Sequence, residues 1–117
     1  MIAHVVLFRP RPYLDAAARE SLAAAFAAAL REIPSIRRAR VGRRVRVGRP
    51  YEMAMRDYPY AAVIEFDDAA GLGAYLNHPA HEQLAARFFT AFEEALMYDF
   101  DLAEGTDGLA SLLSGAH

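Results

Sequence analysis

The segment IAHVVLFR at residues 2–9 is short and rich in β-branched and aromatic side chains, which predicts a buried β-strand. Alternation along this strand divides its side chains between two faces, with Ile2, His4, Val6 and Phe8 on one and Ala3, Val5 and Leu7 on the other. Both faces are apolar, so both have to be covered when the chain folds. The strand is therefore expected in the interior of a sheet with a layer on each side.

The rest of the chain alternates between helix and strand patterns. Asp15 is placed to cap a helix that runs to about Ile33, and Pro79 is placed as the first residue of another helix. The other expected elements are strands at 36–47, 58–66 and 95–102, and a short helix capped by Asp67 or Asp68 that ends at Asn77. The order β-α-β-β-α-β predicts an α+β, ferredoxin-like domain with a four-stranded antiparallel sheet over residues 1–102. Residues 103–117 are expected to form a loose tail with one short apolar turn.

Helices can cover only one face of such a sheet. We expect the other face to be the one that holds Ile2, Val6, Phe8, Ile64 and Phe66, which is too apolar to remain in contact with water. A second copy of the same face is the simplest cover, because symmetric dimers are the commonest oligomers. The sequence therefore predicts a homodimer through the open sheet face, forming a dimeric α/β barrel.

Composition narrows the class of protein. A chain of 117 residues is long enough for one domain, and its net charge of −2 argues against nucleic acid as a partner. The absence of cysteine excludes disulfides, thiolate metal sites and cysteine nucleophiles. No apolar run is long enough to span a membrane and no secretory signal is recognisable, so we expect a cytoplasmic protein without a membrane partner. All 13 basic residues are arginine, which with abundant alanine indicates a GC-rich bacterial gene.

Two histidines flank Pro79 in the segment YLNHPAHEQ at residues 75–83. His78 precedes the helix, where its side chain can cap free backbone N–H groups. His81 lies in the first turn and on the inward face, where the helix dipole and partial burial both favour the neutral imidazole. A neutral histidine can accept a proton, and Tyr75 lies within reach as its hydrogen-bonding acid partner. The alternative is a histidine bonded to backbone beside a packed tyrosine.

Other polar residues admit two interpretations each. His4, in an apolar strand, is either a core histidine with a partner or a group that orients a substrate oxygen. Tyr60 either lines a pocket or belongs to the core. Asp99 is expected to pair with an arginine or with backbone. Two histidines are too few for a metal site, and no motif for phosphate or dinucleotide binding is present, so neither a metal nor a cofactor is expected.

The segments IAHVVLFR, IPSI, YAAVIEF, YLNHPAHEQ and MYDF together resemble the dimeric α/β-barrel stress-responsive (Dabb) family over about residues 1–101. The resemblance implies a ferredoxin-like fold and an obligate dimer. Within that family the chain is similar to polyketide cyclases of the olivetolic acid cyclase type, which close a ring by aldol condensation without a cofactor. The similarity assigns the acid–base pair to His81 and Tyr75 and a pocket histidine to His4, while Tyr60 replaces a further pocket histidine.

The function that follows is binding of a small, apolar, carbonyl-containing ligand between sheet and helices. Its contacts are expected to come from Tyr60, Val6, Phe8, Ile64 and Phe88, and its chemistry to be a cofactor-free aldol-type cyclisation, isomerisation or related lyase reaction at His81, Tyr75 and His4. One alternative is a non-catalytic, stress-responsive ligand-binding dimer. A further alternative is a cofactor-independent monooxygenase.

Overall fold

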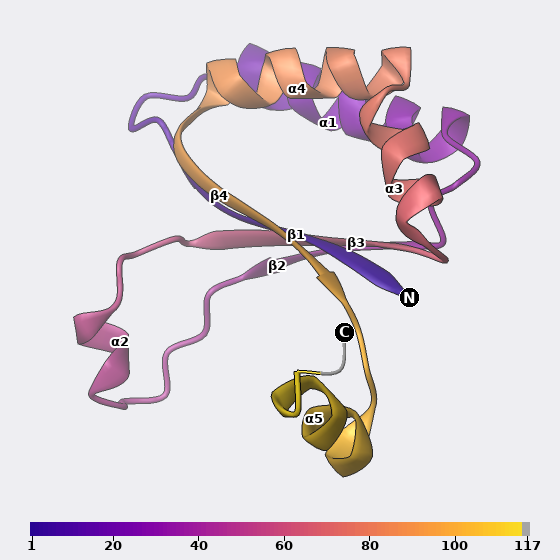
Figure 1. The fold of residues 1–117 in the computed structure, drawn as a ribbon. Helices are drawn as coiled ribbons and strands as arrows, with labels where there is room; N and C mark the ends of the chain where they lie inside the picture. The colour runs from indigo at the N-terminus through magenta and orange to yellow at the C-terminus, as the bar shows by residue number, and fades with distance from the viewer. Residues whose placement is uncertain (116–117) are drawn as a thin grey trace.

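The computed structural model describes residues 1–115. Its sheet has the strand order β2-β3-β1-β4, and all neighbouring strands are antiparallel. Figure 1 shows α1, α3 and α4 together on one side of this sheet. The elements are β1 (Ile2–Pro10), α1 (Ala16–Glu32), β2 (Arg38–Arg43), α2 (Tyr51–Ala54), β3 (Tyr60–Phe66), α3 (Ala69–Leu76), α4 (Pro79–Ala91), β4 (Phe92–Asp101) and α5 (Gly105–Leu113). The predicted ferredoxin-like α+β fold is confirmed.

The helix ends follow from local chemistry that the sequence displays. The Asp15 carboxylate caps α1 by accepting from the backbone N–H of Ala18 at 2.8 Å, and Asp68 caps α3 by accepting from Gly71 at 2.8 Å. Helix α1 ends at Glu32, because Pro34 cannot continue it. Pro79 opens α4, where the missing N–H of proline has no helical partner to lose.

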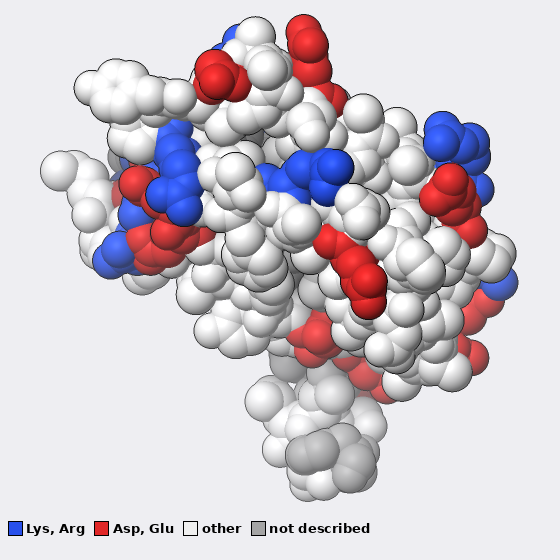
Figure 2. Space-filling view, turned by 90° about the horizontal axis from the view of Figure 1, so that it is seen from above, with Lys and Arg blue, Asp and Glu red and all other residues white. Residues whose placement is uncertain are grey.

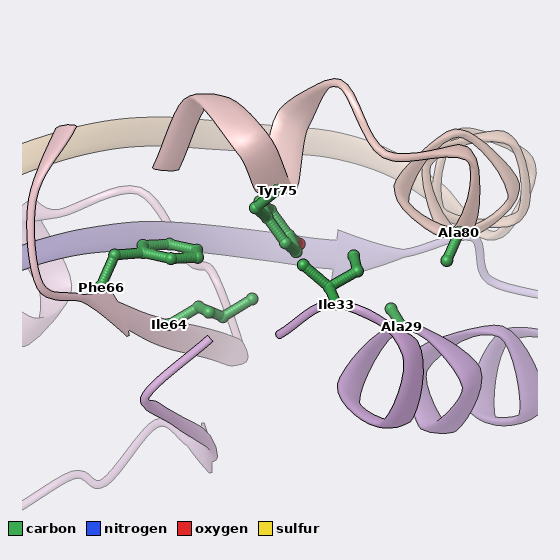
Figure 3. Packing of buried hydrophobic residues seen from close by; sticks show 6 residues of the cluster. All are labelled: Ala29, Ile33, Ile64, Phe66, Tyr75 and Ala80. Atoms are coloured by element: carbon green, nitrogen blue, oxygen red, sulfur yellow. The ribbon is translucent and has the colours of Figure 1, made fainter. Parts of the chain in front are cut away.

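The helices cover the face of the sheet that was predicted to be open, so that prediction is wrong. Ile64 and Phe66 are 3% and 0% exposed, and they pack with Ala29, Ile33 and Tyr75 beneath the helices (Figure 3). Ile2 packs against this core, and Val6 and Phe8 share the same side of β1. Because both faces of β1 are apolar, the alternation of side chains along the strand does not predict which face the helices cover.

No helix within residues 1–115 covers the opposite face of the sheet. It carries Ala3, Val5 and Leu7 of β1 beside Leu96, Tyr98 and Phe100 of β4, which we call the open face. The three β4 side chains are 37%, 55% and 51% exposed. Figure 1 shows α5 beyond β4 and away from the layer of α1 and α4. This helix occupies Gly105–Leu113 of the segment that was expected to form a loose tail with one short apolar turn, and no residue of the helix is buried. The last two residues of that segment, 116–117, lie outside the described residues.

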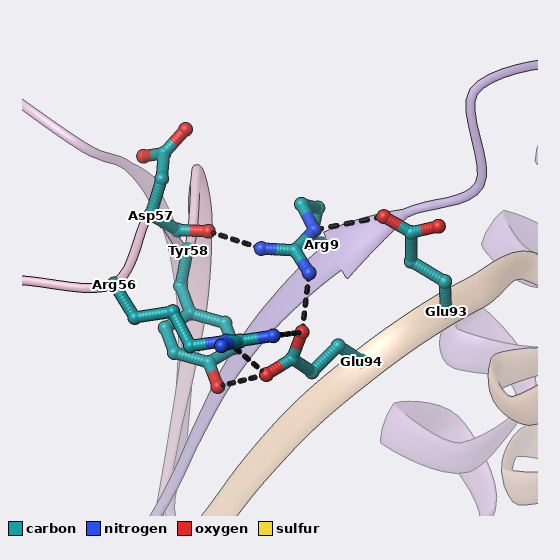
Figure 4. A network of polar contacts seen from close by, with 6 residues as sticks. All are labelled: Arg9, Arg56, Asp57, Tyr58, Glu93 and Glu94. Atoms are coloured by element: carbon teal, nitrogen blue, oxygen red, sulfur yellow. Dashed lines mark hydrogen bonds and ion pairs between the residues drawn. The ribbon is translucent and has the colours of Figure 1, made fainter.

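A polar network ties the β2–β3 connection to the end of the sheet (Figure 4). Arg9 of β1 donates to Glu93 and Glu94 of β4 and to the Asp57 carbonyl oxygen. Arg56 and Tyr58 also donate to Glu94, and these hydrogen bonds lower the pKa of Glu94 to about 2. Seen from the helix side, arginine and acidic side chains gather at this same, left-hand end (Figure 2).

No helix within residues 1–115 combines the length and the apolar character needed to cross a bilayer.

Candidate active site

A pocket of about 860 Å³ lies between the covered face of the sheet and the helices. Its size is within the range of small-molecule sites, and its walls are mainly apolar. All eight residues that the sequence nominated for a site line this pocket: His4, Val6, Phe8, Tyr60, Ile64, Tyr75, His81 and Phe88. They come from β1, β3, α3 and α4, so the fold brings together positions that are far apart in the chain.

The two histidines beside Pro79 have different surroundings. His78 is the N-cap of α4, and its Nδ1 accepts from the backbone N–H of Ala80 at 3.0 Å. His81, in the first turn of the helix, lines the pocket. Burial lowers the pKa of His81, and the nearby His4 lowers it further, against weaker opposing effects of the Leu76 carbonyl and Glu82. His81 is therefore mostly neutral at pH 7, with a ring nitrogen able to accept a proton.

Tyr75 lies against His81, with the ring centroids 4.6 Å apart and the ring planes inclined at 61°. Figure 3 shows Tyr75 reaching from α3 into the core, and the residue is only 2% exposed. Burial raises the pKa of its hydroxyl to about 12. Within residues 1–115 this hydroxyl has no hydrogen-bond partner, so the contact expected with His81 is made by the rings. The protonated hydroxyl remains available to a ligand.

His4 pairs with Asp99, and the expectation that Asp99 meets an arginine or backbone is wrong. The two residues are directly opposite each other on β1 and β4, and His4 Nδ1 lies 2.6 Å from Asp99 Oδ1. His4 is 7% exposed, and its ring centroid is 5.9 Å from that of Tyr75. Asp99 thereby fixes Nδ1 of His4, and Nε2 has no hydrogen-bond partner within residues 1–115. Sequence reasoning missed this partner because it depends on the register between the first and last strands.

Three arginines at the far end of the pocket were also missed. Arg11, Arg19 and Arg43 line the pocket, and each lies in a different segment of the chain. Their common location is visible only after the sheet and α1 have been assembled. Within the described residues no three histidine, aspartate or glutamate side chains are arranged to hold a metal ion.

The sequence profile of the stress-responsive A/B barrel domain, Dabb, matches residues 2–102. The chain therefore belongs to the Dabb family, as the resemblance of its motifs predicted. No protein of curated function matches it in sequence.

Solved structures with the same fold include several different proteins. Hydroxynitrile lyase from Passiflora edulis is 18% identical, with a TM-score of 0.73, covering 89% of this chain and 94% of its own. A dimeric ferredoxin-like protein of unknown function from Thermobifida fusca is 23% identical, with a TM-score of 0.67 and coverage of 86% and 90%. A mutant of SnoaB, a cofactor-independent oxygenase from Streptomyces nogalater, is 18% identical, with a TM-score of 0.65 and coverage of 90% and 95%. Similarity at this level establishes the shared fold.

Proposed function

We propose that this protein is a cofactor-free acid–base enzyme that acts on a small carbonyl compound. The observation that carries the proposal is the contact between a neutral His81 and a protonated, buried Tyr75 on the wall of one pocket. A base and an acid with pKa values on either side of neutrality are what proton transfer next to a carbonyl requires. The apolar body of the substrate rests on Val6, Phe8 and Phe88.

The proposed reaction begins with removal of a proton from the carbon next to the carbonyl. His81 accepts that proton, and the Tyr75 hydroxyl donates a hydrogen bond to the oxygen on which the enolate charge develops. In an aldol closure the enolate carbon then bonds to a second carbonyl carbon, and protonated His81 returns its proton to the new alkoxide. In an isomerisation the proton returns to a different carbon. His4, oriented by Asp99, holds a substrate oxygen in either case.

The direct test is deuterium exchange into the methyl group of acetophenone, a small aromatic ketone, followed by NMR in deuterated water. We expect exchange above the buffer rate and a loss of about 100-fold or more in His81→Ala, because general-base catalysis is typically worth that much. Tyr75→Phe keeps the packing and loses the acid. The control Gln83→Ala alters an exposed residue of α4 and leaves the rate unchanged.

Exchange at the buffer rate, or an equal rate in wild type and His81→Ala, would contradict the enzymatic proposal. Acetophenone binding without exchange would instead favour the second candidate, a non-catalytic ligand-binding protein. The observation behind that candidate is the pocket itself, since a mainly apolar volume of about 860 Å³ can hold a ligand without chemistry.

We also propose that two copies pack through the open face. Leu96, Tyr98 and Phe100 form a row of large apolar side chains exposed along β4, which is unusual on a surface that faces water. The Thermobifida fusca structure is described as dimeric, which supports the association of two copies. Because the pocket lies on the other side of the sheet, each copy keeps its own site.

A further inference from the structure

The pocket has two chemically different ends. His4, Tyr75 and His81 lie near the start of β1, the end of α3 and the start of α4. Arg11 follows the last residue of β1, Arg43 is the last residue of β2, and Arg19 lies in the first turn of α1. Arg11 also donates to the Thr90 carbonyl at the other end of α4, at 2.9 Å. The arginines therefore gather at the end opposite the histidines.

The charge of these arginines is not neutralised within residues 1–115. Arg11 and Arg19 donate only to backbone carbonyls, and the Arg43 guanidinium makes no hydrogen bond or ion pair in this part of the chain. No aspartate or glutamate of the described residues lines the pocket. By contrast, Arg9 and Arg56, which do not line the pocket, pair with Glu94. Three uncompensated positive charges around an apolar cavity attract an anion to this end.

The space between the two ends is apolar. Phe8 packs against Phe88 and Phe92, with ring centroids 5.4 and 4.6 Å away, and those two rings also contact each other. His4 and Phe8 are separated by about 13 Å along β1 at a strand rise of about 3.3 Å per residue. His81 and Phe89 are separated by about 12 Å along α4 at a helix rise of about 1.5 Å per residue. A ligand that spans both ends has an apolar body of about this length.

We propose that the pocket takes an elongated oxo carboxylate, with its carboxylate against Arg11, Arg19 and Arg43 and its carbonyl at His81 and Tyr75. Arginine suits this role, because its planar guanidinium donates two parallel hydrogen bonds to a carboxylate. The placement of the carbonyl rests on the proposed function. The recognition of the carboxylate rests on the charge and geometry of the arginine end alone.

Calorimetric binding of octanoate and of its uncharged amide, octanamide, tests whether the arginine end of the pocket binds a carboxylate. These probes have the same length and differ in charge. Wild type should bind octanoate about tenfold or more tightly, because a hydrogen bond to a charged group is stronger than one to a neutral group. The preference should shrink as salt is added, since Arg11, Arg19 and Arg43 are exposed at the pocket end.

Arg43→Gln is the most informative variant, because the Arg43 side chain makes no hydrogen bond or ion pair within residues 1–115 whose loss would disturb the fold. It should lower the preference for octanoate severalfold, and Arg11→Gln with Arg43→Gln should remove it. Arg31→Gln is the matched control: Arg31 lies in the last turn of α1, beside Glu32 and far from Arg19, and should keep the full preference.

Absence of octanoate binding, equal affinities for the two probes in wild type, or an unchanged preference in the double variant would overturn this inference. Acetophenone carries no charge, so its deuterium exchange judges the proposed function separately. Deuterium exchange of acetophenone without a preference for octanoate over octanamide would refute only the carboxylate site at the arginine end. A preference for octanoate without exchange of acetophenone would support the carboxylate site at the arginine end and refute the catalytic role proposed for His81 and Tyr75.

Discussion

His4 Nδ1 lies 2.6 Å from Asp99 Oδ1, although 95 positions separate the two residues in the chain. The pair forms because β1 and β4 are neighbours and place both side chains on the same rung of the sheet. His4 is buried, while the Asp99 side chain is 44% exposed. A carboxylate at this position orients the imidazole by holding its Nδ1.

The first prediction concerns Asp99→Asn, which keeps the shape of the side chain and removes its charge. We expect the free energy of unfolding at neutral pH to fall by about 1 kcal/mol, less than for a fully buried charged hydrogen bond because Asp99 is partly solvated. If Asp99 positions His4, kcat for acetophenone exchange falls while KM changes little. Urea unfolding and exchange kinetics measure the two effects.

Asp101→Asn is the control for this prediction, since Asp101 lies two residues along β4 with a side chain that is 84% exposed. It should change the free energy of unfolding by less than about 0.5 kcal/mol. Equal effects of the two substitutions on stability and on kcat would contradict a specific role for Asp99.

The second prediction is the pH dependence of exchange. Only neutral His81 can accept a proton, and burial lowers its pKa from 6.5. The rate constant should therefore fall on the acid side with a midpoint below pH 6.5. Tyr75 stays protonated until the pH nears its pKa of about 12, so it causes no loss in the neutral range. A midpoint for the acid limb above 6.5 would exclude His81 in this environment as the base.

Local chemistry made much of the fold predictable. Asp15 and Pro79 mark helix starts by capping geometry and by a fixed backbone angle, and the structure places both as expected. The eight site residues could be predicted from the sequence because the family resemblance and the spacing of Tyr75 and His81 pointed to the same part of the fold. Helix α5 could have been recognised from the spacing of Leu109, Leu112 and Leu113.

What the sequence left open depends on tertiary arrangement. Two apolar faces on β1 carry no signal for which one the helices will cover. The partner of Asp99 follows from pairing between the two most distant strands. Likewise, Arg11 and Arg43 become neighbours of one pocket only when the ends of β1 and β2 meet at the same edge of the fold.

The third prediction uses the buried hydroxyl of Tyr75. Its pKa is about 12 in the folded protein, against 10 without burial, so the folded state holds this proton more tightly. The resulting stability is fully present below pH 10 and is lost as pH rises toward 12. Two pKa units correspond to about 3 kcal/mol at most. Unfolding at several alkaline pH values should show this loss in wild type and a correspondingly smaller one in Tyr75→Phe.

Tyr13→Phe removes a hydroxyl from a residue that is 96% exposed and should keep the wild-type pH dependence. Identical alkaline slopes for wild type and Tyr75→Phe would mean that the Tyr75 hydroxyl is solvated rather than buried at the pocket wall.

The last prediction tests the open face. Tyr98→Glu places a charge in the middle of the proposed interface, and two-fold symmetry introduces it twice. Because burying an unpaired carboxylate is strongly unfavourable, the dimer should dissociate into monomers at concentrations at which wild type remains dimeric. Sedimentation velocity measures both states. The same change at the exposed loop residue Tyr13 adds equal charge and should leave the dimer intact. A monomeric wild type, or a Tyr98→Glu dimer of undiminished affinity, would show that the copies do not associate through β4.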